Sequence, residues 1–207
     1  MQSQILRNQV KNHLLGQIQK GELKVGQTIN LAALSRGMGI SVTPIREALS
    51  QLEHAKAIKA IPKRGFVVAH LDKKEASDLY HTVAQLEMMA LESSNFSEDD
   101  LALLRLQQSR TQQMAAPMDR LKARFDFHAL LVKNCSNMVL LQVLDNLKVR
   151  LHFYEQGFGE DTSFYGLMNN QNEAILQAIE EDNVPTATLI LKMNWMTVLE
   201  YVQNRIG

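Results

Sequence analysis

Residues Gly39–Leu49 have the sequence GISVTPIREAL, which contains two good N-cap residues and a proline within four positions. Ser41 and Thr43 favour the start of a helix, and Pro44 is tolerated only in a first helical turn, where its missing N–H has no partner to lose. A helix is therefore predicted from residues 41–43 to about residue 55. Three apolar residues are expected to face inward from it: Ile45, Leu49 and Leu52.

A hairpin is predicted immediately downstream, in Lys59–Ala69, which has the sequence KAIPKRGFVVA. Residues 58–61 and 66–69 are β-prone, and the segment between them contains both a proline and a glycine. Two β-prone runs joined by such a short segment are typical of a tight antiparallel turn.

Two further helices are predicted upstream. Val10 and Leu14 recur at helical spacing, so the first twenty residues are expected to form one amphipathic helix that ends near Gly21. Residues 24–30 favour a turn and a very short strand, and residues 31–38 a short helix closed by a glycine. Three helices followed by a hairpin are typical of a winged helix-turn-helix.

The rest of the chain shows long helical patterns and hardly any strand signal. The predicted fold class is therefore mainly α, with a winged helix-turn-helix domain in residues 1–70 and an all-α bundle of about six helices in residues 75–207. The expected helices span residues 75–94, 97–114, 118–134, 137–156, 165–182 and 185–205.

Charge is distributed unequally between these two parts. Residues 1–70 hold ten Lys or Arg against three acids, a net charge of +7, whereas residues 71–207 hold twelve against nineteen, a net charge of −7. The single cysteine, Cys135, excludes an internal disulfide and is expected to be a buried core residue. The sequence contains no apolar run of membrane-spanning length and no signal peptide, so a cytoplasmic protein is expected.

The basic domain is expected to bind double-stranded DNA. In a helix-turn-helix the first residues of the second helix meet base edges, and here these are Ser41, Val42, Thr43, Pro44 and Arg46. Arg46 is the strongest candidate, because a guanidinium donates two parallel hydrogen bonds to guanine. At the hairpin tip, Lys63, Arg64 and Gly65 are expected to reach the DNA backbone or the minor groove. Each residue alone is more typical of an ordinary charged surface, but the ordered set in a domain of net charge +7 favours DNA binding.

The stretch GISVTPIREALSQLEHAKAIKAIPKRGFVVA closely resembles the winged-helix signature of GntR-type transcription regulators, and the match covers nearly all of residues 5–69. The helical part is similar to the ligand-sensing domain of the FadR subgroup through Asp78–Glu92 and Phe127–Leu144. The resemblance implies a homodimeric regulator, a repressor or an activator, whose helical domain binds a small effector and thereby changes the DNA affinity. A two-fold dimer would bind a near-palindromic operator.

The chain departs from the family pattern at several functional positions. A recognition-helix arginine of the family falls on Val42, so the operator is expected to differ. Many members hold a metal through an Asp four residues before a His, followed by two later histidines. Here His128 matches the first histidine, but Arg124 occupies the Asp position, and the later positions fall on Asn172 and on Asn194, or on Met193 after a shift of one residue. These residues are too few for a metal, so no metal or other cofactor is expected.

These substitutions suggest that Arg124 binds an anionic effector directly, most simply a carboxylate, with Asn172 and Asn194 as neutral hydrogen-bonding groups. The cavity wall is expected to include His81, His128 and His152, together with Tyr80 and Tyr154. In the alternative interpretation, Arg124 lies on the surface beside an acid and the asparagines fill a degenerate pocket. The chain would then be a constitutive DNA-binding regulator.

An enzyme is not expected. Cys135 lies seven residues beyond His128, about 10 Å along a helix, which is too far for a thiolate and its base. The sequence shows no P-loop and no paired-carboxylate helix motif. The effector, the operator sequence and the dimer interface are left open by the sequence.

Overall fold

The computed structural model describes residues 2–19, 22–24, 26–54, 56–70, 72–155 and 161–206. Two compact units are found: one contains residues 1–72 with 147–156, and the other contains residues 73–146 with 157–207. No helix within the described ranges is both long and apolar enough to span a bilayer.

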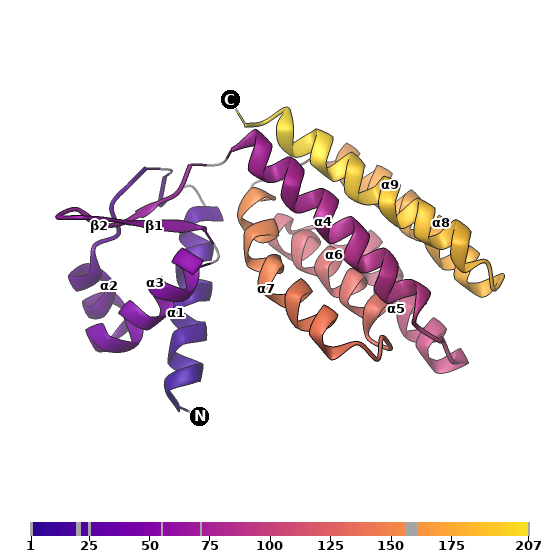
Figure 1. The fold of residues 1–207 in the computed structure, drawn as a ribbon, viewed down its shortest axis with the longest axis horizontal. Coiled ribbons are helices and arrows are strands. Elements are labelled where there is room, and N and C mark those ends of the chain that lie inside the picture. The colour runs from indigo at the N-terminus through magenta and orange to yellow at the C-terminus, as the bar shows by residue number, and fades with distance from the viewer. Residues whose placement is uncertain are drawn as a thin grey trace. The chain divides into compact units, whose positions relative to one another are not determined.

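The first unit contains the predicted winged helix-turn-helix, which Figure 1 shows as three helices beside a two-stranded hairpin. The strands are antiparallel, with Ile58 opposite Val68, and Thr28 adds a single bridge to Val67. This bridge is the very short strand expected in residues 24–30. The elements are α1 (Gln2–Gln19), α2 (Leu31–Met38), α3 (Val42–His54), β1 (Ile58–Ile61) and β2 (Gly65–Val68).

Local chemistry sets the boundaries between α2 and α3. The side chain of Asn30 accepts a hydrogen bond from the backbone N–H of Ala33 and caps the start of α2. Gly39 adopts a left-handed backbone with φ of 64° and donates its N–H to the Ser35 carbonyl, which ends the helix as predicted. The next helix begins at Val42, within the predicted range. Gly21, where α1 was expected to stop, lies outside the described residues.

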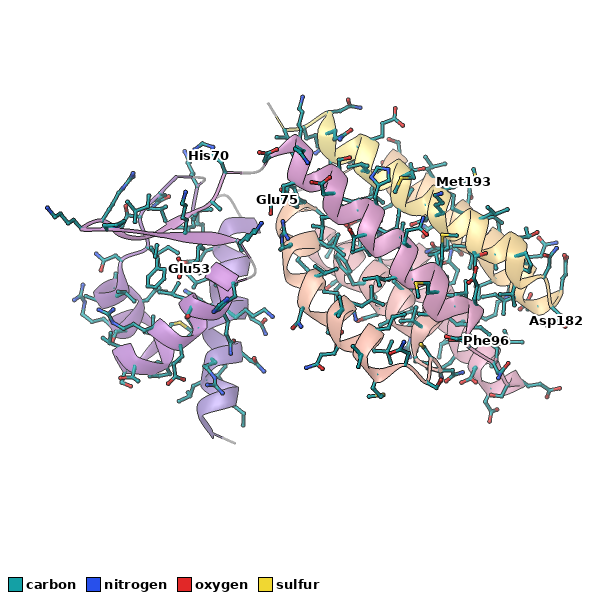
Figure 2. The ribbon with its side chains drawn as sticks, viewed as in Figure 1. Glu53, His70, Glu75, Phe96, Asp182 and Met193 are labelled. Carbon is teal, nitrogen blue, oxygen red and sulfur yellow. The ribbon has the colours of Figure 1, made fainter. Side chains whose placement is uncertain are left out.

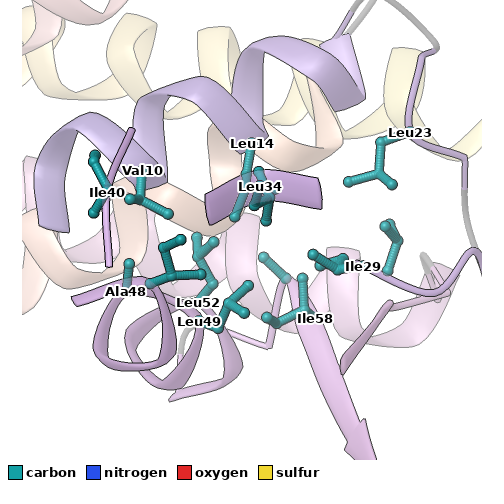
Figure 3. Packing of buried hydrophobic residues seen from close by; sticks show 13 residues of the cluster. Val10, Leu14, Leu23, Ile29, Leu34, Ile40, Ala48, Leu49, Leu52 and Ile58 are labelled. Carbon is teal, nitrogen blue, oxygen red and sulfur yellow. The ribbon is translucent and has the colours of Figure 1, made fainter. Parts of the chain in front are cut away.

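The core of the winged helix-turn-helix is apolar. The predicted inward-facing residues Ile45, Leu49 and Leu52 are all buried, and Figure 3 shows the last two packed with residues of α1, α2 and β1. Among the described residues up to position 70, every buried side chain is apolar. The members labelled in Figure 3 are Val10, Leu14, Leu23, Ile29, Leu34, Ile40, Ala48, Leu49, Leu52 and Ile58.

The remainder of the chain is helical, as predicted, and no helix boundary differs from its expected position by more than three residues. Cys135 is buried, as expected, and accepts a hydrogen bond from the Ser93 hydroxyl. Residues 147 onward in α7 belong to the first unit. The helices are α4 (Lys73–Glu92), α5 (Glu98–Gln113), α6 (Pro117–Val132), α7 (Met138–Tyr154), α8 (Thr162–Glu180) and α9 (Val184–Gln203).

Five of these helices form a closed ring of neighbours. α4 packs on α9, α9 on α8, α8 on α5, α5 on α6, and α6 again on α4. Figure 2 shows Phe96, which follows α4, and Asp182, which precedes α9, at the same end of the unit, so these two helices run antiparallel. A ring of helices encloses one common interior, and a residue from any of the five can contribute to it.

Candidate DNA-binding surface and effector site

The predicted DNA contacts lie on one side of the start of α3. Ser41, Thr43 and Arg46 are exposed, and Val42 retains 40% of its accessible surface. Pro44 is half-buried. Ile45, within the same turn, is fully buried and holds the opposite face against the core. The apolar face therefore fixes the orientation of the helix and leaves the polar face open to a ligand.

The charges of α3 are arranged asymmetrically. Glu47 forms an ion pair with Arg7 of α1, with 3.1 Å between the carboxylate and guanidinium atoms. The side chain of Arg46, its neighbour in sequence, makes no hydrogen bond or ion pair within the described residues. Glu47 is thus matched by a cation, while the donors of Arg46 remain available for an acceptor such as a guanine edge.

The two cations of the hairpin tip differ: Lys63 points to solvent, whereas Arg64 is hydrogen-bonded within the domain. Lys63 is exposed and has a φ of 63°, and Gly65 has a φ of 84°, so the turn holds two left-handed residues. The Arg64 guanidinium donates from Nε to the Thr28 hydroxyl at 3.1 Å and from Nη2 to the Gly26 carbonyl at 3.0 Å. The structure thus gives Arg64, expected to reach for DNA, an internal role: it fastens the wing to the segment upstream of α2.

In the helical unit, one group of buried residues centres on Glu87 of α4, which is 3% exposed. Its Oε2 accepts a hydrogen bond from the Trp195 indole N–H at 2.7 Å and lies 2.7 Å from Nδ1 of His128. Because an ionised carboxylate only accepts, this contact places the imidazole proton on Nδ1. α4, α6 and α9 are joined here by two charge-assisted hydrogen bonds.

Arg124 belongs to the same group. It lies one turn before His128 on α6, is 1% exposed, and its guanidinium carbon lies 4.6 Å from the centroid of the Trp195 ring. A guanidinium over an indole face at this distance is a cation–π contact. The interpretation that places Arg124 on the surface is therefore wrong. We call Glu87, Arg124, His128 and Trp195 the buried charge cluster.

A second group consists of three buried side-chain amides, Gln108 of α5, Asn172 of α8 and Asn194 of α9, each at most 2% exposed. Asn194 Nδ2 donates to Asn172 Oδ1 at 3.4 Å, and Asn172 Nδ2 donates to Gln108 Oε1 at 3.2 Å. Gln108 Nε2 donates to the backbone carbonyl of Asn169 at 3.0 Å. We call these three residues the amide relay. Each of the five ring helices therefore contributes at least one polar residue to the buried charge cluster or to the amide relay.

Two of the predicted effector residues are placed differently. His81 is exposed and its Nδ1 lies 2.7 Å from the Ser77 carbonyl, so the expectation that it lines an internal cavity is wrong. His81 directly follows the buried Tyr80, and successive side chains on a helix are about 100° apart around its axis, so His81 faces away from the interior. His152 is half-buried beside the Lys148 carbonyl and, like Tyr154, lies in the segment 147–156 of the first unit. Tyr80 lies 5.9 Å from Trp195 between ring centroids.

Sequence reasoning missed Glu87, Gln108 and Trp195. A signal existed for Glu87, because it lies on one helical face with four buried residues and is the only acid on that face. The four residues are Tyr80, Val83, Ala84 and Leu91. An acid within an apolar stripe indicates a buried partner. No such signal existed for Gln108, because α5 is polar over most of its length.

The residues present do not fit a metal. A divalent transition metal takes three or four nitrogen, sulfur or carboxylate ligands, and no group of three such residues comes together in the part of the chain that the structure describes. In the buried charge cluster, only Glu87 and His128 could act as ligands, and a permanent cation lies beside them. The buried charge cluster therefore lacks the ligand set of a divalent metal site.

Comparison with known proteins agrees with this architecture. Residues 6–68 match the family model of bacterial regulatory proteins of the gntR family, and residues 78–193 match the FCD domain. The chain is 30% identical to the uncharacterized HTH-type transcriptional regulator YdhC of Bacillus subtilis, over 70% of this chain and 67% of YdhC. It is also 30% identical to the HTH-type transcriptional regulator McbR of Escherichia coli, over 69% and 67% of the two chains.

Solved structures share the fold. That of E. coli McbR/YncC has a TM-score of 0.82 at 22% identity and covers 98% of this chain and 99% of its own. A putative GntR regulator from Rhodococcus sp. RHA1 has a TM-score of 0.80 at 15% identity, over 97% and 99%. The named relatives are regulators, in agreement with the prediction that this chain is not an enzyme. The chain belongs to the GntR family of DNA-binding transcriptional regulators and carries an FCD domain as its helical part.

Proposed function

We propose that this protein is a cytoplasmic, homodimeric regulator whose helical domain binds a small carboxylate through Arg124, without a metal or other cofactor, and thereby changes operator affinity. The observation that carries this proposal is the burial of Arg124, at 1% exposure, beside Glu87, His128 and Trp195. A guanidinium cannot lose its charge in a protein, so it brings a permanent positive charge into the interior.

The chemistry of Arg124 suits a carboxylate. Its planar fork matches two carboxylate oxygens with parallel hydrogen bonds, and such pairs are stronger than neutral ones. In relatives with a metal, the ion would supply the positive charge; here a side chain at the corresponding position supplies it. Glu87 already accepts hydrogen bonds from His128 and Trp195, and these two bonds fix the position of its carboxylate.

The DNA part of the proposal depends on α3. Arg46 would read a guanine in each half-site, Ser41 and Thr43 would contact phosphates or base edges, and the exposed methyl groups of Val42 would contact a thymine methyl. One winged helix reads only a few base pairs. Two copies related by a two-fold axis would bind a near-palindrome with higher affinity.

Effector and operator would be linked through the dimer. A ligand shifts an equilibrium only if it binds one arrangement more tightly than the other, and the effect is reciprocal. A carboxylate that bridges Arg124 to other ring helices would favour one packing of the ring over another. The operator affinity would follow that packing.

The test is a thermal-unfolding screen of the chelator-treated full chain against small carboxylates. We expect at least one to raise the Tm, because a ligand that binds only the folded state stabilises it. Arg124→Ala should abolish this shift, and Arg124→Lys, which keeps the charge but loses the fork, should weaken binding by about tenfold. The control is Lys122→Ala, which removes an exposed cation from the same helix and should leave the shift intact.

Two results would contradict the proposal. One is carboxylate binding that survives Arg124→Ala unchanged, and the other is binding that appears only after a divalent metal is restored. A screen in which no compound stabilises the protein would favour the constitutive regulator instead. That alternative draws support from the amide relay, whose members already bond to one another.

A further inference from the structure

The amide relay has a fixed direction. Its last member, Gln108, donates from Nε2 to the Asn169 backbone carbonyl, a group that can only accept. The NH₂ group of Gln108 must therefore point to that carbonyl, and its Oε1 must point to Asn172. Exchanging the oxygen and nitrogen of any one amide would set two acceptors or two donors against each other.

The same reasoning extends along the relay to its other end. Asn172 donates to Gln108, so its Oδ1 faces Asn194 and accepts from Asn194 Nδ2. The oxygen of Asn194 is then the open end of the relay. Asn194 is 0% exposed, and its Oδ1 has no hydrogen-bond partner within the described part of the chain.

A buried carbonyl oxygen without a donor is costly, because it has lost its hydrogen bonds to water and gained none in return. An effector or a water could supply the missing donor. The relay also polarises this oxygen, since each amide that donates at one end becomes a better acceptor at the other. The site therefore favours a ligand that carries an O–H or N–H group.

We infer that Asn194 Oδ1 selects the effector by a hydrogen-bond donor, so that the effector is a small carboxylate that also bears a hydroxyl or amino group. This inference rests on the proposed function, in which Arg124 holds the carboxylate. Asn194 adjoins Trp195 in sequence, and the Trp195 ring lies against Arg124 of α6, so the turn of α9 that carries Asn194 also contacts the guanidinium.

The experiment uses the chelator-treated full chain and matched probes that share a carboxylate and a carbon skeleton and differ in the donor group, which is a neutral hydroxyl in one pair and a charged ammonium in the other. Lactate is compared with propionate for the hydroxyl group, and alanine with propionate for the amino group, with longer homologous pairs alongside. By isothermal titration, we expect a donor-bearing member to bind about tenfold more tightly than its plain partner. The pair that shows the larger ratio identifies the donor as hydroxyl or amino.

Two variants assign this preference to the relay. Asn194→Leu has nearly the same volume but no acceptor, and should bring the affinity ratio within each pair to about one. Gln108→Met removes the last member of the relay, which does not itself contact the open oxygen of Asn194. It should therefore reduce the affinity ratio only partly. The control is Asn170→Leu, an exposed asparagine on α8, which should keep the ratio of the wild type.

The outcomes separate this inference from the proposed function. Equal binding of both members of every pair, with binding still dependent on Arg124, would overturn the role of Asn194 and leave the proposed function standing. A preference for the donor-bearing probe that survives Asn194→Leu would likewise overturn the role of Asn194 and leave the proposed function standing. Failure of every probe to bind would overturn both.

Discussion

The two parts of this protein use polar residues in opposite ways. In the winged helix, the buried side chains among the described residues up to position 70 are all apolar, and the charges lie outside. In the helical unit, an acid, an arginine, a histidine and three amides are buried within a ring of five helices. The first part therefore acts through its surface, and we propose that the second acts through its interior.

This difference determines where substitutions should be costly. A surface that binds DNA can lose a side chain with little effect on folding, because water replaces the lost contacts. A buried polar group cannot, because its partners remain without water when it is removed. The same type of substitution should thus affect binding in one part and stability in the other.

The largest effect is expected for Glu87→Ala. Removing this carboxylate leaves the His128 and Trp195 donors without their acceptor beside a buried guanidinium, so we expect a loss of about 3–5 kcal/mol in the free energy of unfolding. Denaturant titration of the full chain measures it. The control is Glu173→Ala, which removes a half-buried acid at the surface that pairs with Arg105 and should cost less than about 1 kcal/mol. Equal losses would contradict the contrast between interior and surface.

A smaller effect, on binding alone, is expected for Arg46→Ala. Loss of a bidentate guanine contact should reduce the preference for an operator, selected from a random duplex pool, by about 1–3 kcal/mol relative to scrambled DNA. Thermal stability should not change. Arg36→Ala, which removes an exposed cation from α2, should weaken binding to both duplexes alike. If Arg46→Ala also weakens both alike, this residue does not read bases.

The hairpin tip offers a comparison between two adjacent cations. Lys63→Ala should weaken binding to every duplex and lower the salt dependence by about one unit of slope, without changing stability. Arg64→Ala should instead lower the free energy of unfolding by about 1 kcal/mol, since it breaks bonds to Thr28 and Gly26. Salt titration and thermal unfolding on both variants separate the two roles. A reversed pattern would show that Arg64 is the DNA contact.

The smallest effect concerns acid stability. Asp161 accepts hydrogen bonds from the Ser163 and Tyr201 hydroxyls and from the Phe164 N–H, and these hold the pKa of its carboxyl below its usual range. Burial, together with the contact to Asp161, raises the pKa of Tyr201 to about 12. A depressed pKa in the folded state means that Asp161 contributes stability above the unfolded pKa, near about 4, and loses it as the pH falls further.

Asp161→Asn should therefore lower the Tm at neutral pH and narrow the difference from wild type as the pH falls below about 4. Glu200→Gln, an exposed acid on α9, is the control and should follow the wild-type curve. A constant difference at every pH would show that the charge of Asp161 plays no part.

Sequence predicted the local features well. The stop at Gly39, the start of α3 and the turn at residues 62–65 each depend on residues a few positions apart, whose preferred backbone conformations are known. Helical periodicity also predicted the helices of the second part. The resemblance to a family identified Arg124, Asn172 and Asn194 as candidate effector-binding residues.

Long-range partners could not be predicted from a single sequence. Glu87 and Trp195 are 108 positions apart, and Arg64 and Gly26 are 38 apart, so nothing local indicates that they meet. His81 shows the limit of reasoning by residue type: one position separates it from a buried tyrosine, and that single step turns it to solvent. Packing of one helix against another decides such cases.

The most direct test of the account is the operator affinity measured with and without a stabilising carboxylate, in wild type and in Arg124→Ala. We predict that the carboxylate changes the operator Kd of the wild type by about fivefold or more, and leaves the Kd of the variant unchanged. An operator Kd that does not respond in the wild type, or that responds equally in both proteins, would contradict the account.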